Sequence, residues 1–152
     1  MKREDSQKSS DTILTFTELP VNDLVQQNLR RAHFTTPTPV QAQTLKPGLA
    51  GRDILGTAQT GTGKTLAFLL PILDRLFRSS IRGIEALILV PTRELAMQVL
   101  DTLQLIGRGT GISTTLVIGG MSESRQLGAI RTGAKVIIAT PGRLDDYLKR
   151  RL

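Results

Sequence analysis

The sequence predicts an α/β fold in which a parallel sheet is covered by flanking helices. Short, mostly apolar segments at residues 86–90, 114–118 and 135–139 are each followed by a segment with helical spacing. Strands that are apolar along their length are buried on both faces, and strands that alternate with helices usually pair in parallel. The length of 152 residues, 39% of them hydrophobic, suits a single domain.

The first fifty residues are expected to form a tail and two helices. Residues 1–15 are mostly polar and are expected to be a flexible tail. Apolar side chains recur at helical spacing over residues 21–33, which predicts an amphipathic helix. Pro39 suits the first position of a second helix, which we expect to end near residues 47–48.

After residue 50, strands and helices are expected to alternate. Residues 53–57 are a further short apolar segment and are predicted to form the first strand. A long helix is predicted from Gly63, and Pro71 is expected to kink it or to end its regular part. Further helices are predicted over residues 92–106, over residues 122–131 and from residue 142 onward.

The composition excludes several classes of protein. The absence of cysteine rules out disulfides, thiolate zinc sites and cysteine nucleophiles, and the single His33 cannot build a histidine metal cluster. No apolar run reaches the ~20 residues of a membrane span and no secretory signal follows Met1, so we expect a cytoplasmic protein without a membrane partner. The net charge of +7 favours a polyanionic partner, although a soluble surface alone is the alternative. The few aromatic residues disfavour a protein that stacks successive bases on its rings.

Residues 58–65, Ala-Gln-Thr-Gly-Thr-Gly-Lys-Thr, have the composition and position of a phosphate-binding loop. They lie between a predicted strand and a predicted helix, so that glycine N–H groups and a helix N-terminus can surround phosphate. Lys64 would reach the β- and γ-phosphates, and the Thr65 hydroxyl would hold Mg²⁺. Ala58 departs from the general pattern, which begins with glycine, and an ordinary glycine-rich turn is the alternative.

The catalytic site is incomplete on the residues alone. Phosphoryl transfer also needs an acidic side chain at the end of another strand to hold the metal or to position water. The later strands are instead followed by Pro91-Thr92, Gly119-Gly120 and Thr140-Pro141. A phosphate loop by itself therefore does not name the reaction.

Five segments follow one another along the chain: residues 34–41 (Phe-Thr-Thr-Pro-Thr-Pro-Val-Gln), 58–65, 91–96 (Pro-Thr-Arg-Glu-Leu-Ala), 119–120 and 140–143 (Thr-Pro-Gly-Arg). Together they resemble the motifs of the DEAD-box RNA helicases. The resemblance covers residues 16–152 and implies a RecA-like P-loop NTPase sheet with flanking helices. His33 and Val40 replace a glycine and an isoleucine that are common in the family, whereas Ala58 is normal there. The matching segments are residues 34–41 (the Q motif), 58–65 (motif I), 91–96 (motif Ia), 119–120 (the GG element) and 140–143 (motif Ib).

The resemblance implies an ATP-dependent RNA helicase, in which RNA-stimulated ATP hydrolysis is coupled to local unwinding of an RNA duplex. ATP and Mg²⁺ are the implied cofactors, with Lys64 and Thr65 in catalytic roles and Thr65 as the metal ligand. Gln41 would read adenine, since its amide can donate to N7 and accept from N6. Phe16 would stack on the base, and simple packing under the first helix is its alternative role. The implied nucleotide contacts are Phe16, Phe34, Gln41, Ala58, Gln59, Thr60, Gly61, Thr62, Gly63, Lys64 and Thr65.

RNA is the implied partner, bound through its backbone without sequence specificity. The implied contacts lie just past the carboxyl ends of predicted strands, where open α/β sheets bind ligands. Arg93 could instead form an ion pair with Glu94 or another acid, and Glu94 would support the loop because a carboxylate repels phosphate. The implied RNA contacts are Pro91, Thr92, Arg93, Gly119, Gly120, Thr140, Pro141, Gly142 and Arg143.

The family's acidic motif II, its motif III and its second domain are not found among the 152 residues. The resemblance therefore implies a sheet that is incomplete at the C-terminus, with a Q-motif region at residues 16–50 and a partial RecA-like helicase domain at residues 51–152. A catalytically inactive fragment that binds nucleotide or RNA is the alternative function, and we expect no ATP turnover from these residues alone. Side chains expected beside unfilled sheet positions are Ile54, Leu87, Ile88 and Leu89.

Overall fold

The computed structural model describes residues 15–152, so all but one residue of the expected N-terminal tail lie outside the described part. The chain divides into two compact units, one ending at Arg75 and the other beginning at Leu76, where its length alone predicted one domain. The division falls within a helix, α3 (Lys64–Arg78). Each unit is described by itself below.

The first unit contains the short 3-10 helix η1 (Phe16–Glu18), α1 (Asp23–Arg31), α2 (Pro39–Leu49) and the start of α3. Helix α1 begins where the Asn22 side chain accepts a hydrogen bond from the Leu24 N–H, and it ends with basic residues that suit the helix dipole. Proline at the first position and a capping box fix the start of α2. Helix α3 continues through Pro71, so the predicted interruption does not end it.

The strand predicted over residues 53–57 does not form, and that prediction was wrong. Residues 52–59 have no regular secondary structure, and the Leu55 side chain is 99% exposed. A strand needs a neighbour for its backbone hydrogen bonds, and the three strands of the described chain pair only with one another. An apolar sequence alone is therefore not enough to make this segment a strand.

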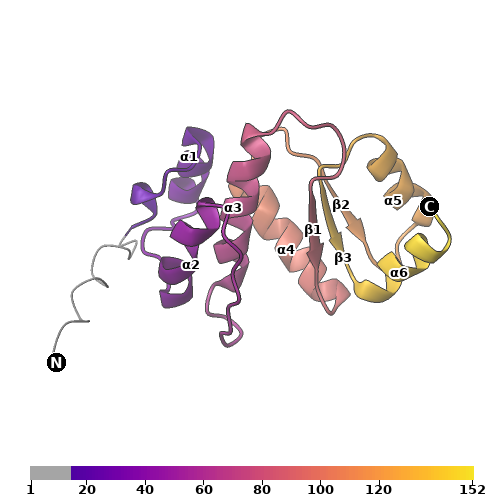
Figure 1. Ribbon diagram of the computed structural model, residues 1–152, viewed down its shortest axis with the longest axis horizontal. Helices are drawn as coiled ribbons and strands as arrows, with labels where there is room; N and C mark the ends of the chain where they lie inside the picture. The colour runs from indigo at the N-terminus through magenta and orange to yellow at the C-terminus, as the bar shows by residue number, and fades with distance from the viewer. Residues whose placement is uncertain (1–14) are drawn as a thin grey trace, which may run out of the picture. The chain divides into compact units, whose positions relative to one another are not determined.

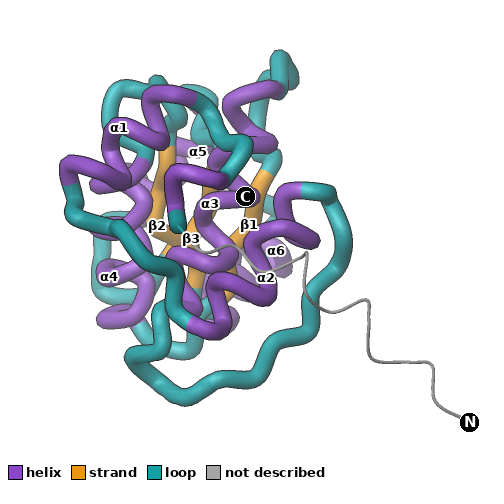
Figure 2. Tube along the Cα trace, turned by 90° about the vertical axis from the view of Figure 1, so that its left-hand side faces the viewer, coloured by secondary structure: helices purple, strands orange, loops and turns teal. Residues whose placement is uncertain are grey.

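The second unit is an α/β sheet structure, as predicted. Its three strands are parallel in the order β1-β3-β2, and Figure 2 shows them side by side with β3 in the middle. Helix α4 lies on one side of the sheet, and α5 and α6 lie on the other (Figure 1). The elements are β1 (Ala86–Leu89), α4 (Arg93–Ile106), β2 (Thr114–Val117), α5 (Glu123–Arg131), β3 (Val136–Ala139) and α6 (Pro141–Lys149).

The core of the second unit follows the alternation of side chains along the strands. Val117, Ile137 and Ala139 pack with Tyr147 on the side of α5 and α6. The intervening residue Ile138 is fully buried and faces the α4 side, because successive strand residues point to opposite faces. Burial on both faces explains why β3 reads as a continuous apolar run.

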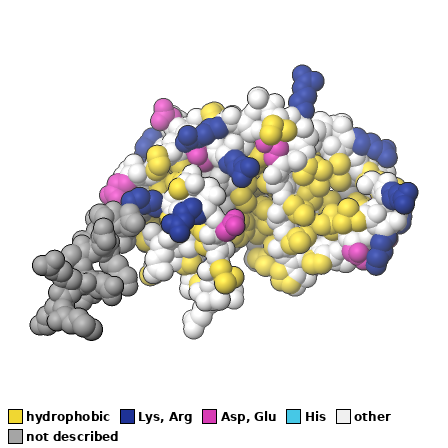
Figure 3. Space-filling view, in the orientation of Figure 1, with side chains coloured by type: hydrophobic (Ala, Val, Ile, Leu, Met, Phe, Trp, Pro, Cys, Tyr) yellow, Lys and Arg dark blue, Asp and Glu magenta, His cyan; other side chains and the backbone are white. Residues whose placement is uncertain are grey.

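Strand β1 leaves an apolar edge exposed on the second unit. It pairs with β3 on one side only within the described chain, and Leu87 and Leu89 are about half exposed, at 50% and 53%. Figure 3 shows apolar side chains gathered over this part of the sheet. The expectation for Ile88 was wrong, since its side chain is only 7% exposed and faces inward. Ile54 is 43% exposed, but it lies outside the sheet and therefore does not border an unfilled sheet position. No helix among residues 15–152 is both long and apolar enough to cross a bilayer.

Candidate phosphate-loop and strand-end sites

In the predicted phosphate loop, the Lys64 side chain binds backbone carbonyls of the loop itself, and we call this arrangement the closed form of the loop. Lys64 is the first residue of α3, and its Nζ donates hydrogen bonds to the carbonyls of Ala58 and Gln59, the latter at 2.7 Å. The Thr62 hydroxyl donates to the same Gln59 carbonyl at 2.8 Å. The lysine thus satisfies carbonyl oxygens at one end of the loop while the N-terminal N–H groups of α3 lie at the other.

Gln41 joins the Q-motif segment to this loop. The side chain is 4% exposed; its Oε1 accepts from the Thr38 N–H at 2.9 Å, and its Nε2 donates to the Gly63 carbonyl at 2.9 Å. Gly63 has a φ of +90°, and a Cβ there would overlap the Gln41 amide. One N–H and one lone pair of that amide are left over by these two bonds. The adenine contact inferred for Gln41 stays a prediction.

Phe16 lies in the core of the first unit, at 2% exposure. Its ring packs edge-on against Phe34, with the centroids 6.0 Å apart. Its carbonyl accepts a hydrogen bond from the Gln26 side chain at 2.9 Å, which fixes the backbone of η1. This is the packing role that was the alternative interpretation, and stacking on a base would require the Phe16 ring to leave these contacts.

The predicted RNA contacts converge at one edge of the sheet in the second unit. Parallel strands bring their carboxyl ends together, and the segments that follow β1, β2 and β3 line an open cavity of about 640 Å³. Gly120 and Pro141 are not among its lining residues, and Glu94 and Asp146 add carboxylates to it. The predicted contacts that line the cavity are Pro91, Thr92, Arg93, Gly119, Thr140, Gly142 and Arg143.

Two helices begin at this cavity. Thr92 caps α4, where its hydroxyl accepts from the Leu95 N–H at 3.2 Å, and Thr140 precedes α6, which has Pro141 at its first position. The free N–H groups and the positive end of a helix dipole both favour anions. The cavity therefore combines hydroxyls, helix starts and arginines, a set of groups suited to phosphate.

The two arginines of the cavity differ in how they are held. Within residues 15–152, Arg93 forms no ion pair, which argues against the pair with Glu94; its guanidinium instead lies against Gly120, which has a φ of +75°. Arg143 lies 3.4 Å from a Glu123 oxygen and 3.5 Å from an Asp146 oxygen, and over the Tyr147 ring. Its Nε is buried without a hydrogen-bond partner. Arg93 is thus the more available cation.

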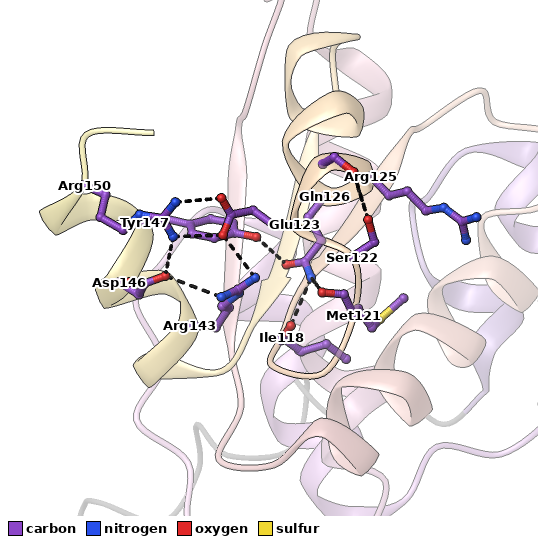
Figure 4. Close-up of polar contacts among 11 residues, drawn as sticks. Ile118, Met121, Ser122, Glu123, Arg125, Gln126, Arg143, Asp146, Tyr147 and Arg150 are labelled. Atoms are coloured by element: carbon purple, nitrogen blue, oxygen red, sulfur yellow. Dashed lines mark hydrogen bonds and ion pairs between the residues drawn. The ribbon is translucent and has the colours of Figure 1, made fainter.

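Glu123 is the centre of an ion-pair network between α5 and α6 (Figure 4). Arg150 donates two hydrogen bonds to it, at 2.7 and 2.8 Å, and a third to Asp146 at 3.1 Å. The hydrogen bonds from Arg150 and the nearby charge of Arg143 lower the pKa of Glu123. Sequence reasoning missed this network. The spacing of Arg143, Asp146 and Arg150 on one helix could have indicated its local half, but nothing in the sequence links Glu123 to it.

Known proteins resemble this chain in sequence and in structure. The family model described as DEAD/DEAH box helicase matches residues 38–152. The ATP-dependent rRNA helicase RRP3 of Yarrowia lipolytica is 42% identical over 142 residues, which are 93% of this chain and 29% of that protein. The chain thus spans about 29% of the length of this curated relative.

Two solved structures share the fold. The RNA helicase Prp28 of Chaetomium thermophilum, bound to ADP, matches with a TM-score of 0.84 and 37% identity, over 92% of this chain and 35% of that one. A hypothetical ATP-dependent RNA helicase of Sulfolobus tokodaii matches with a TM-score of 0.76 and 35% identity, over 86% and 37% of the two chains. These matches confirm the predicted RecA-like fold class. On the sequence match over most of its length, this chain belongs to the DEAD/DEAH box helicase family.

Proposed function

We propose that this chain binds ATP through residues 58–65 and the RNA backbone through the strand-end cavity, as part of an ATP-dependent RNA helicase. Family membership supports the activity. The observation that carries the RNA part is the cavity itself, in which seven of the nine residues inferred from the motifs come together from three strands. The parallel strands bring these segments, which are far apart in the sequence, to the edge of the sheet at which open α/β folds bind ligands.

The groups of the phosphate loop fit a triphosphate. The Lys64 ammonium, the N-terminal N–H groups of α3 and the Thr65 hydroxyl supply hydrogen-bond donors and one oxygen ligand for a metal ion. For binding, Lys64 would exchange the carbonyls of Ala58 and Gln59 for phosphate oxygens. When bound, Mg²⁺ would neutralise charge on the phosphates, with Thr65 as its protein ligand.

Gln41 is the proposed reader of the base. Gln41 would select adenine, and its hydrogen bond to the Gly63 carbonyl also fixes the loop that would bind the phosphates. Base and phosphate recognition are then linked through one buried amide. A Gln41 contact with adenine would use the N–H and the lone pair that its two intramolecular bonds leave over.

The strand-end cavity is proposed to bind phosphates and sugars, not bases. Hydroxyls, helix starts and arginines position a nucleic-acid backbone but carry no sequence information. Arg93 is the principal cation, since Arg143 is shared with two carboxylates. Glu94 and Asp146 also line the cavity, and their carboxylates would weaken the binding of phosphate close to them.

Hydrolysis coupled to local unwinding of RNA duplexes is proposed for the whole protein. Phosphoryl transfer needs an acidic side chain to hold the metal or to position water, in addition to the hydroxyl that Thr65 supplies. The alternative function, binding of nucleotide and RNA without turnover, applies to residues 1–152 taken alone.

Binding of a fluorescent ATP analogue and of a single-stranded RNA tests the proposal. Lys64→Ala should weaken the binding of the analogue by at least tenfold, because a charge-assisted bond to phosphate contributes about 1.5–3 kcal/mol. Lys149→Ala is the matched control, since the Lys149 side chain is 75% exposed and pairs with Asp145 at 2.7 Å, and it should leave binding unchanged. Equal binding by the Lys64 variant and the unmodified chain would contradict the proposal.

A further inference from the structure

Gln126 closes the turn that contains Gly119 and Gly120. This residue of α5 is only 3% exposed, and its Nε2 donates to the carbonyls of Ile118, at 3.0 Å, and Met121, at 3.2 Å (Figure 4). Residues 119–120 form a turn, and the Gln126 amide joins the carbonyls on its two sides. The side chain of Gln126 therefore helps to hold the shape of the turn.

The orientation of the Gln126 amide is fixed from α6. Its Oε1 accepts a hydrogen bond from the Tyr147 hydroxyl at 3.2 Å, and the Arg143 guanidinium lies 4.7 Å from the centre of the Tyr147 ring. Two carbonyls on one side and a hydroxyl donor on the other satisfy every polar group of this amide except one lone pair. Gln126 and Tyr147 thus connect the turn after β2 to α6, and both the turn and α6 contribute residues to the strand-end cavity.

These hydrogen bonds of Gln126 to the turn, here called the Gln126 clamp, set the direction of the Gly119 N–H. In a trans peptide the carbonyl of one residue and the N–H of the next point in opposite directions. Since the Ile118 carbonyl points to Gln126, the Gly119 N–H points away from α5. Gly119 lines the strand-end cavity, and the described residues provide no acceptor for its N–H. The hydrogen is free for an oxygen in the cavity.

We propose that Gln126 is a positioning residue for the RNA backbone, holding the Gly119 N–H toward a phosphate oxygen, with Tyr147 holding Gln126. The inference rests on the proposed RNA function of the cavity. It assigns a role to two buried side chains that lie outside the motifs of the sequence and do not themselves touch RNA. Arg93 braces the same turn from the cavity side, through its contact with Gly120.

The test measures the affinity of the 152-residue chain for a fluorescently labelled single-stranded RNA of ten nucleotides, at several salt concentrations. Gln126→Leu should lower the affinity about tenfold, since a misdirected N–H loses a bond to a charged phosphate. Gln126→Glu keeps the size of the side chain but, when ionised, cannot donate, and should lower the affinity at least as much. Tyr147→Phe removes only a hydroxyl and should lower it about threefold.

Gln26→Leu is the matched control for the loss of stability caused by removing a buried amide that joins two carbonyls. Gln26 is also buried, and its Nε2 also donates to two carbonyls, of Phe16 and Leu19, but it belongs to the first unit. Its melting temperature should fall somewhat less than that of Gln126→Leu, because the Gln26 Oε1 has no hydrogen-bond partner to lose, while its RNA affinity should stay within about twofold of the unmodified chain. A loss of RNA affinity in proportion to the loss of stability in both variants would overturn the inference.

Arg93→Ala separates the inference from the proposed function. If Arg93→Ala weakens RNA binding and Gln126→Leu does not, the cavity binds RNA but the clamp has no part in it. If neither variant weakens binding, the RNA function itself is wrong. Should Gln126→Leu fail to fold, Tyr147→Phe decides, because an unchanged RNA affinity in that variant contradicts the positioning role.

Discussion

Replacing Gly63 with alanine tests the contact between the Q-motif segment and the phosphate loop. A non-glycine residue at the φ of +90° costs about 1–2 kcal/mol. The added Cβ would also displace the Gln41 amide from the Gly63 carbonyl, which leaves the Nε2 of the buried Gln41 unpaired at a cost of about 1–3 kcal/mol, while the carbonyl keeps its bond from the Ala67 N–H. The expected loss is therefore about 2–5 kcal/mol in the free energy of unfolding.

Gly61→Ala is the control for the backbone term. Gly61 has a similar φ of +84°, but a Cβ there would meet nothing within 4 Å, so its loss should be only about 1–2 kcal/mol. Urea unfolding followed by circular dichroism gives both values, and binding of a fluorescent ATP analogue shows whether the loop still functions. If the two variants lose the same stability, the Gln41 contact contributes nothing and the structural reasoning about this loop is refuted.

Three further predictions concern recognition and charge. Gln41→Ala should weaken the binding of ATP by about 1–3 kcal/mol and reduce its preference over GTP, measured by competition; equal binding of ATP and GTP by the unmodified chain would contradict adenine reading. Arg93→Ala should lower the slope of log affinity for RNA against log salt by about one unit or less, and Arg143→Ala should lower it less; a loss confined to one RNA sequence would indicate base reading instead. The pKa of Glu123 should lie below the ordinary value for a glutamate and should rise in Arg150→Ala, as followed by carboxyl NMR. Because the folded-state pKa is lowered, the Glu123–Arg150 pair stabilises the fold above about pH 4.3, and this stabilisation is lost as the pH falls through the folded-state pKa.

Most elements of this chain could be predicted from the sequence because each carries a local signal. The run Val136–Ala139 is apolar throughout, as a strand covered on both faces must be, and the capping box that ends at Gln41 marks the start of α2. Residues 53–57 have an equally apolar sequence but no partner strand in the described chain. Pairing is a property of the neighbours of a segment, so it cannot be deduced from that segment alone.

In the candidate sites, too, local sequence motifs were predictable, whereas contacts between separate elements were not. The motifs predicted which residues would meet at the strand ends, because parallel strands must bring their carboxyl ends together. They did not indicate that Arg143 is held by Glu123 or that Phe16 is buried against Phe34, since both contacts join separate elements of the chain. The turn clamp made by Gln126 has no sequence signature either, because its partners are backbone carbonyls, which every residue possesses.

In the closed form of the phosphate loop, two backbone carbonyls of the loop compete with the phosphates of a nucleotide for the Lys64 ammonium. The Lys64 ammonium is already engaged by the carbonyls of Ala58 and Gln59, so the measured affinity for a nucleotide is the intrinsic affinity reduced by the fraction of loops that are open. A compound that lacks phosphate has nothing to exchange for those carbonyls and cannot shift the loop toward its open form. Substitutions that destabilise the closed loop without touching the phosphate contacts should therefore raise the apparent affinity for ATP, with the nucleoside left unaffected.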